Sequence, residues 1–483
     1  MRILIALLIA MSFPVYGFSA EKAAANPEGK KVYDGWCAQC HGYKGDADSF
    51  TKDVSLPQPR DFTFGTYKFR STPSGDPPTD EDITKIIRKG NPGTSMPPWT
   101  RFTDAEVKAV VEHVKSFAPD TFAMERKPIN IGNPPKASKE IIEQGKEQFK
   151  IAKCVDCHGK TGRGDGDKGW QDDFKTDWGY GIAPADYTHG WELRNGSTLE
   201  DIYRTISVGL SGTPMTSYLD SLPDDKRWAL AHFITSLQLT RKLGLALKVG
   251  RVESLPSKPN DPAWEKVDYL DLPMGGQLMF DKREFTPVIT NVRVRGLYTS
   301  KELVILLQWT DKKPNDGSDG KPADSVRIQF PVKKHEGSEL PYFFMGTSKA
   351  PVNMWQWKAS DKEKVFDMTA KGPDKVEPKD KAEATVMATY EDGLYSVVFK
   401  KELKSAKDDP VFEIGKFIPF SITAFDGRNG EDGLTKGAVS AWYYLMMEPP
   451  TPMQVYVFPP VVALGVLIAG IGLHKSLRKN KKG

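Results

Sequence analysis

Cysteine and histidine are scarce in this chain. Its 483 residues include four cysteines and seven histidines. All four cysteines fall in two short motifs, at 37–41 and 154–158, so none is left to form a disulfide framework. A surplus of basic residues is also missing, because the net charge is only +4 and cations close to the two ends account for it. A basic face that binds nucleic acid is therefore not expected.

Both cysteine motifs read C-x-x-C-H, with Cys-Ala-Gln-Cys-His at 37–41 and Cys-Val-Asp-Cys-His at 154–158. This is the attachment motif of c-type haem, in which two thiols bond to the macrocycle and the adjacent histidine binds the iron. Zinc is the alternative, but a structural zinc site gathers four ligands, whereas these cysteines occur as isolated pairs. The motifs therefore predict two covalent haems c, with Cys37, Cys40, Cys154 and Cys157 as attachment points and His41 and His158 as iron ligands.

The two haem motifs open similar stretches of sequence. Glu-Asp-Ile occurs at 81–83 and again at 200–202, and a methionine beside a proline recurs at Met96 and Met215. These repeats have nearly the same separation as the haem motifs, so we interpret the chain as containing a duplicated haem domain. The expected boundaries are 27–118 for the first domain, 119–137 for a proline-rich linker and 138–245 for the second domain.

The repeated methionines are candidates for the sixth iron ligand. A thioether is a soft, neutral donor that favours ferrous iron, so His/Met ligation raises the reduction potential. A single methionine more often packs in a core, but Met96 and Met215 recur at matching positions, which favours ligation. Arg70 and Arg194 also correspond. Each of these arginines either neutralises a haem propionate or is exposed to solvent.

The two stretches resemble class I c-type cytochromes in their haem motifs, methionine loops and terminal helices. The resemblance implies all-α domains that carry electrons through a partly exposed haem edge. Six-coordinate iron leaves no open position for a substrate, so we expect a relay and not an enzyme. A di-haem peroxidase is the alternative, and it would need one displaceable sixth ligand.

Beyond a second linker, predicted at 246–261, the pattern changes to short strands separated by turns. Asp392-Gly393 lies between two apolar runs, which is typical of a hairpin. The densely charged segment 358–383 is expected to be a solvated loop. The pattern predicts an antiparallel β-sandwich over 262–450. The expected strands include 292–295, 303–307, 326–330, 388–390, 395–399, 417–422 and 441–445.

Three stretches of this region resemble the haem b-binding γ subunit of ethylbenzene dehydrogenase and its relatives. They are Pro-Tyr-Phe-Phe-Met-Gly at 341–346, Pro-Val-Asn-Met-Trp-Gln-Trp-Lys at 351–358 and Phe-Asp-Gly-Arg-Asn-Gly at 425–430. The resemblance implies a non-covalent haem b whose iron is held by a methionine and a lysine. The matching positions are Met345 and Lys436, and Met354 is the runner-up methionine.

Histidine offers little choice for this third haem. His335 is the only histidine between 262 and 450, so two histidines of this region cannot hold the iron. A ligating lysine must be neutral, and its pKa of about 10.4 in water must fall through burial and metal bonding. Without haem b, the region would be a ligand-binding module in which tryptophans stack on a sugar. The candidates for stacking are Trp355, Trp357 and Trp442.

Both ends carry predicted targeting segments. Residues 1–20 combine an early cation, an apolar run and small residues, as in a secretory signal peptide. Residues 455–473 are almost wholly apolar and about long enough to span a bilayer. The basic tail at 474–483 would stay in the cytoplasm, so the bulk of the chain would face the periplasm. The expected location is the inner (cytoplasmic) membrane, crossed once.

Together these features predict two all-α cytochrome c domains, then an antiparallel β-sandwich, then one C-terminal transmembrane helix. The resemblance implies an electron-transfer subunit that connects a molybdenum oxidoreductase with the respiratory chain. Enzymes of this class act on nitrite or nitrate, selenate, chlorate or hydrocarbons. The expected partners are a molybdenum catalytic subunit, an iron–sulfur subunit, and a soluble cytochrome or a membrane oxidase or quinone system.

Overall fold

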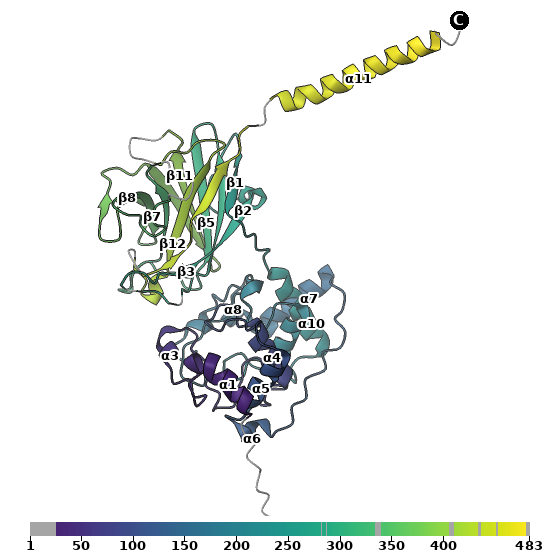
Figure 1. The fold of residues 1–483 in the computed structure, drawn as a ribbon, viewed down its shortest axis with the longest axis vertical. Helices are drawn as coiled ribbons and strands as arrows, with labels where there is room; N and C mark the ends of the chain where they lie inside the picture. The colour runs from purple at the N-terminus through teal and green to yellow at the C-terminus, as the bar shows by residue number, and fades with distance from the viewer. Residues whose placement is uncertain are drawn as a thin grey trace, which may run out of the picture. The chain divides into compact units, whose positions relative to one another are not determined.

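The chain divides into two compact units. The computed structural model describes residues 26–281, 283–285, 287–333, 340–404, 410–432, 436–450 and 453–479. The first unit comprises 1–137, 175–180 and 194–231, and the second comprises 138–174, 181–193 and 232–483. The predicted second haem domain, 138–245, therefore contributes to both units. Helices build the first unit, whereas the second combines helices with a large sheet (Figure 1).

Helix α1 (Pro27–Trp36) packs on α5 (Asp104–Lys115) in the first unit. A Cβ atom at Gly29 would lie 2.0 Å from the carbonyl oxygen of Ala109, so only glycine permits this close approach. Helix α4 (Asp80–Lys89) joins them, and α4 and α5 both begin with a threonine capping box. The remaining helices of this unit are α2 (Ala38–His41), α3 (Phe50–Val54), α6 (Pro119–Phe122) and α9 (Leu199–Val208).

The helical part of the second unit surrounds the second haem motif. It contains α7 (Lys139–Ile151), α8 (Val155–His158) and two short 3-10 helices. Phe149 of α7 packs against Phe233, with ring centroids 5.3 Å apart. Phe233 belongs to α10 (Asp224–Leu237), which starts in one unit and ends in the other. The 3-10 helices are η1 (Asp167–Trp170) and η2 (Gly190–Glu192).

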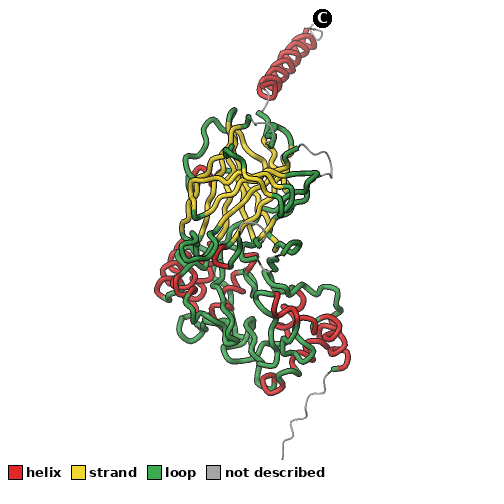
Figure 2. Tube along the Cα trace, turned by 90° about the vertical axis from the view of Figure 1, so that its left-hand side faces the viewer, coloured by secondary structure: helices red, strands yellow, loops and turns green. Residues whose placement is uncertain are grey.

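Within the described residues, 14 strands join into one hydrogen-bonded sheet. The main path runs β10-β11-β5-β4-β1-β14-β12-β6-β7-β8-β9. Figure 2 shows these strands gathered in one block. The strands are β1 (Ala246–Arg251), β2 (Tyr269–Pro273), β3 (Gly275–Gly276), β4 (Asn291–Tyr298), β5 (Glu302–Thr310), β6 (Ser325–Pro331), β7 (Val352–Lys358), β8 (Asp361–Ala370), β9 (Val376–Pro378), β10 (Ala384–Glu391), β11 (Leu394–Glu402), β12 (Phe417–Phe425), β13 (Ala438–Val439) and β14 (Tyr443–Met447).

The sheet folds over a large apolar cluster to which strands from both ends of the path contribute. Trp309 of β5 and Trp357 of β7 lie far apart along the strand path, yet their ring centroids are 6.3 Å apart. Both side chains are about 1% exposed. The two arms of the sheet therefore face each other, as in a two-layer sandwich. The hairpin predicted around Asp392-Gly393 is present as β10 and β11.

Two predictions about this region are wrong. The expected linker 246–261 begins with β1, which runs parallel to β4 and to β14, so the sheet is mixed and not purely antiparallel. Leu247 and Val249 alternate with exposed residues and are buried, which is the pattern of a strand. The expected charged loop 358–383 forms β8 and β9, because β7 supplies hydrogen-bonding partners to β8 and the charged half of β8 stays exposed.

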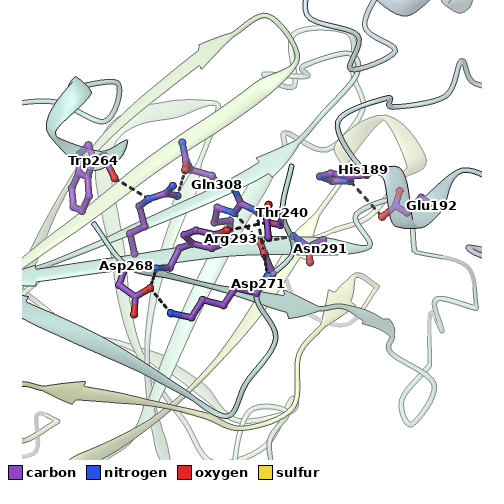
Figure 3. A network of polar contacts seen from close by, with 12 residues as sticks. His189, Glu192, Thr240, Trp264, Asp268, Asp271, Asn291, Arg293 and Gln308 are labelled. Atoms are coloured by element: carbon purple, nitrogen blue, oxygen red, sulfur yellow. Dashed lines mark hydrogen bonds and ion pairs between the residues drawn. The ribbon is translucent and has the colours of Figure 1, made fainter. Parts of the chain in front are cut away.

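Polar contacts join the sheet to the segment between α10 and β1, at Thr240 and Lys242 (Figure 3). The Arg293 guanidinium donates two hydrogen bonds to the Asp271 carboxylate, of 2.8 and 3.0 Å. It donates a third to the Thr240 carbonyl oxygen at 2.9 Å. The backbone N–H of Lys242 donates to the same carboxylate at 2.8 Å. A bidentate arginine–carboxylate pair has a fixed geometry. The segment that leads into β1 is therefore anchored and does not behave as a free tether.

The predicted terminal segments fare differently. Residues 1–20 lie outside the described part of the chain, as do 480–483. Helix α11 (Met453–Lys479) forms where the span 455–473 was predicted. However, no helix among the described residues has both the length and the apolar character needed to cross a bilayer, so the predicted span is not supported.

Candidate functional site

The first haem motif presents its histidine with one ring nitrogen already bonded. Cys37 precedes the single turn α2, which contains Cys40 and His41. The His41 Nδ1–H donates to the carbonyl oxygen of Arg60 at 2.9 Å. The ring also stacks on Phe62, with centroids 4.5 Å apart, and burial lowers the pKa of His41. A histidine fixed through Nδ1 offers Nε2 to a metal, which is the usual arrangement of a ligating imidazole.

The second motif repeats this arrangement on α8. His158 is buried, and its Nδ1–H donates to the carbonyl oxygen of Ala185 at 3.2 Å. Its ring stacks on Tyr187, with centroids 4.3 Å apart, and the Tyr187 hydroxyl lies 3.0 Å from Nε2. Burial lowers the pKa of His158 to about 4, so the imidazole is neutral near pH 7. A neutral imidazole is the form that binds a metal.

The residues that orient the two histidines were not predicted from the sequence. A short repeated pattern could have revealed them. Residues 59–63 read Pro-Arg-Asp-Phe-Thr and residues 184–188 read Pro-Ala-Asp-Tyr-Thr. In each copy the second residue supplies the carbonyl for the histidine and the fourth supplies the stacking ring. In each copy the aspartate also accepts the threonine N–H at 2.8 Å. The duplication therefore extends to the loop that holds the ring.

The predicted methionine ligands sit on two loops with the same hydrogen bonds. Both loops lie in the first unit. The Met96 carbonyl accepts the N–H of Asn91 at 3.0 Å, and the Met215 carbonyl accepts that of Leu210 at 2.9 Å. Each methionine N–H donates to the threonine hydroxyl two residues earlier, at 3.1 and 3.2 Å. Both side chains are half-buried.

Glycine permits these two loops. Gly90 and Gly209 both have φ of +68°, a left-handed conformation that L side chains rarely adopt. A Cβ atom at these positions would lie 2.8 Å from the Met96 carbonyl oxygen and 2.9 Å from that of Met215. In the first unit, Cys37 and Trp99 pack on the same apolar cluster. The haem motif and the Met96 loop therefore border one core.

Met345 lies in an apolar, aromatic part of the second unit. Its side chain is 1% exposed, and it packs with Phe344, Val352 and Val439. Its φ is +61°, an unusual conformation for a residue other than glycine. The Met345 N–H donates to the Gln329 side chain at 3.2 Å, which holds the strained turn. Strain of this kind is common where a side chain must be aimed.

Lys436 lies near this cluster in sequence but is bonded elsewhere. It is three residues before Val439, which belongs to the Met345 cluster. Its Nζ donates to the Asn429 carbonyl at 2.8 Å and lies 3.8 Å from the buried Glu284 carboxylate. Met354 is buried, and its sulfur accepts a hydrogen bond from Arg327 at 3.6 Å. His335 lies outside the described residues.

The stretch 425–430, which carried part of the family resemblance, folds over buried carboxylates. Asp426 caps the short 3-10 helix η4 (Gly427–Asn429) by accepting the N–H of Asn429 at 3.0 Å. The N–H of Gly427 donates to Asp324 at 2.8 Å. Burial raises the pKa of Asp324 to about 6. Burial and the neighbouring Asp324 and Asp426 raise the pKa of Asp311.

These carboxylates predict a pH-dependent stability. A carboxyl whose folded pKa exceeds its unfolded value of about 3.9 binds its proton more tightly when folded. The free energy of unfolding therefore falls as the pH rises from about 4 to about 6, the folded value for Asp324. We expect Asp311→Asn to raise the melting temperature of the sheet region at pH 7, because the repulsion between the buried carboxylates is relieved, and to change it little at pH 4.

Scanning calorimetry at both pH values checks this prediction. Asp316→Asn is the control, because Asp316 lies on the same loop but is exposed. If Asp311→Asn lowers the melting temperature at pH 7, or shifts it equally at both pH values, the carboxylates do not repel one another as described.

Among the described residues, no group of three or more His, Cys, Asp and Glu side chains is arranged to hold a metal ion.

The tryptophans considered for sugar stacking are not free to do so. Trp355 and Trp357 are each about 1% exposed and belong to the sandwich core. Trp442 is half-buried, and its indole N–H donates to the Pro341 carbonyl at 2.8 Å. Stacking on a ligand needs an accessible ring face, so the prediction of a sugar platform on Trp355 and Trp357 is wrong.

Three family models match the chain. Residues 24–114 match the model for cytochrome c oxidase, cbb3-type, subunit III, and residues 142–238 match the cytochrome c model. Residues 261–385 match the ethylbenzene dehydrogenase model, which includes Met345 and ends before Lys436. This chain is a multihaem cytochrome with an ethylbenzene dehydrogenase family domain. The family resemblance inferred from its motifs is thereby confirmed.

This multihaem cytochrome is similar to a curated relative and to a chain of known structure. The "Putative respiratory nitrate reductase heme subunit ORF7" of Haloferax mediterranei is 25% identical over 234 residues, which cover 48% of this chain and 83% of the relative. A chain of the reducing HAO-like protein complex of Kuenenia stuttgartiensis is 39% identical, with 45% of this chain and 98% of that chain covered and a TM-score of 0.43. The cytochrome is thus similar to a protein whose name describes a haem subunit.

A third similarity is too low to support any statement about fold or function. Carbohydrate-binding modules of family 9 from Caldicellulosiruptor kristjanssonii, solved with glucose and with cellotriose, are 11% and 14% identical. They cover 43% of the cytochrome and have TM-scores of 0.27 and 0.28. Neither the topology of its sheet nor a sugar site follows from similarity at this level.

Proposed function

We propose that this multihaem cytochrome is an electron-transfer subunit that carries two haems c and one haem b. The observation that supports it most directly is the repeated geometry of His41 and His158. Each ring is fixed through Nδ1 by a backbone carbonyl, and each is matched by a methionine loop with identical hydrogen bonds. Two haem sites with the same ligand geometry are suited to two similar electron carriers. A single catalytic centre would not need a second copy of the site.

The haem c ligands in this proposal are His41 with Met96, and His158 with Met215. Haem supplies a one-electron couple whose potential the axial ligands set. The chain's own side chains fit it: both histidines are held through Nδ1, and their neutral form is favoured by burial. Arg70 adds a buried Nη1 that has no hydrogen-bond acceptor among the described residues. A haem propionate is the kind of anion that such a donor suits.

The haem b ligands in this proposal are Met345 and Lys436. The apolar surroundings of Met345 suit a non-covalent macrocycle. Ligation by Lys436 requires loss of its proton and of its hydrogen bond to Asn429. Glu284, with a carboxylate oxygen 3.8 Å from Nζ, is placed to accept that proton. Binding of haem by Lys436 would therefore replace its present contacts with Asn429 and Glu284.

The partner in this proposal is a molybdenum oxidoreductase with an iron–sulfur subunit. The name of the Haloferax relative, which refers to a nitrate reductase haem subunit, supports a partner of this general kind. The cytochrome itself would not act on the substrate, because its irons would be six-coordinate. Electrons would leave toward a soluble cytochrome, an oxidase or a quinone system.

We further propose that the cytochrome works on the periplasmic side of the inner membrane. Two features support this location. Residues 1–20 resemble a signal peptide in sequence, and α11 has an apolar surface on which Leu464 and Leu467 are 60% and 61% exposed. Protease digestion of spheroplasts tests the side of the membrane. Digestion of the cytochrome in intact spheroplasts is expected, and full protection would overturn this part of the proposal.

The proposed function is tested on the purified full chain. A pyridine haemochrome spectrum before and after acid–acetone extraction is expected to show two covalent haems c and one extractable haem b. Carbon monoxide is expected to leave the spectrum of both reduced haems c unchanged, because their sixth positions are filled. Ready carbon monoxide binding at one haem c would instead favour the peroxidase alternative.

A further inference from the structure

Arg70 belongs to the first haem stretch but bonds to the second. Its side chain is 1% exposed, so it is not the solvent-exposed residue that was one of the two sequence interpretations. Its Nε donates to Pro73 O at 3.1 Å, within the same stretch. Its Nη2 donates to Val208 O at 2.7 Å, which is 138 residues away along the chain. Burial lowers the pKa of Arg70.

Val208 is the last residue of α9 and the base of the Met215 loop. Gly209 follows it in a left-handed conformation, and the N–H of Leu210 then holds the Met215 carbonyl at 2.9 Å. Ser217, on the far side of the loop, donates to the Ser207 carbonyl at 2.6 Å. The loop is thus closed at its base by one backbone hydrogen bond and by the Ser217 hydroxyl, next to the carbonyl that Arg70 holds.

Other contacts join the same two stretches within the first unit. Lys85 of α4 donates to Asp201 of α9 at 2.8 Å. Burial alone would raise the pKa of Asp201, but the hydrogen bonds from Lys85 and Arg204 lower it, so the Asp201 carboxylate is charged at neutral pH. Arg194, the counterpart of Arg70, makes a longer contact of 3.5 Å to Gly93 O in the Met96 loop. The arginines therefore reach in opposite directions, each toward the other methionine loop.

We propose that Arg70 is a positioning residue for Met215, so that a side chain of the first haem domain controls ligation of the second haem. A buried, charged donor on the Val208 carbonyl fixes the end of α9. Without that donor, the buried carbonyl lacks its partner and the loop that starts at Gly209 loses its anchor. This inference rests on the proposed ligation by Met215.

The test reads methionine ligation separately at each haem. Ferric iron bound by a methionine sulfur gives a weak charge-transfer absorption band, which is lost when the thioether leaves. Met96→Leu and Met215→Leu, each in the full-length haem-loaded chain, isolate the band of the other haem. We expect Arg70→Met to abolish the band in the Met96→Leu background and to leave it intact in the Met215→Leu background. Arg70→Lys is expected to retain part of it.

Each outcome has one meaning. If Arg70→Met removes the band in the Met215→Leu background, or leaves both bands intact, Arg70 does not position Met215 and the inference fails. If Met215→Leu alone leaves the wild-type band unchanged, Met215 is not a ligand and the proposed function itself is at fault. Two covalent haems per chain in every variant establish that the domains have formed. Arg88→Met is the matched control, because the Arg88 guanidinium bonds within its own stretch to Phe102 and Asp104.

Discussion

Replacing Met215 by histidine is expected to lower the midpoint potential of one haem c by on the order of 0.1 V or more. A thioether favours ferrous iron, whereas a second imidazole favours ferric iron, and axial ligands as a group set potentials over roughly 0.8 V. The Met96 haem should keep its potential, because its own ligands are unchanged. A spectroelectrochemical titration of the purified cytochrome would resolve two haem c waves that separate in the variant.

Met124→His is the control for this prediction. Met124 is also in the first unit, but it is 48% exposed and outside both methionine loops. Its replacement is expected to leave both waves in place. An unchanged titration for Met215→His would show that Met215 does not bind iron, whatever the hydrogen bonds of its loop.

Replacing Lys436 by alanine is expected to remove haem b while both haems c remain. Substitutions of residues that only support a metal ligand weaken binding about 10–100-fold, so loss of a ligand should cost at least about 100-fold in haem affinity. The covalent haems do not depend on this side chain, because they are attached through cysteines. Extraction of non-covalent haem, followed by quantification against the haem c of the same sample, measures the effect.

Lys371→Ala is the matched control, because Lys371 has similar exposure and also forms an ion pair. The Lys371 side chain is 32% exposed and pairs with Glu377 at 2.9 Å, whereas that of Lys436 is 28% exposed. A lysine that serves only in an ion pair should leave haem b in place when it is replaced. Equal haem b content in Lys436→Ala and Lys371→Ala would remove Lys436 from the ligand set.

Features that depend on local chemistry could be predicted without the fold. Two thiols and an imidazole must meet one macrocycle, so the spacing within 37–41 and 154–158 indicates haem c without any knowledge of the fold. The duplicated methionine loops could also be predicted, because Met96 and Met215 recur at matching distances after their haem motifs. The hairpin around Asp392 followed from its turn residues, since a two-residue turn constrains the chain within a few positions.

Features that depend on pairing between distant segments could be seen only in the folded chain. Residues 246–251 form β1 because β4 and β14 supply hydrogen-bonding partners on both sides, and no local pattern of six residues encodes such partners. β8 was mistaken for a loop because its first half is charged and exposed, which is a pattern typical of loops. The bond between Arg70 and Val208 is likewise invisible in the sequence, because it joins residues that only folding brings together.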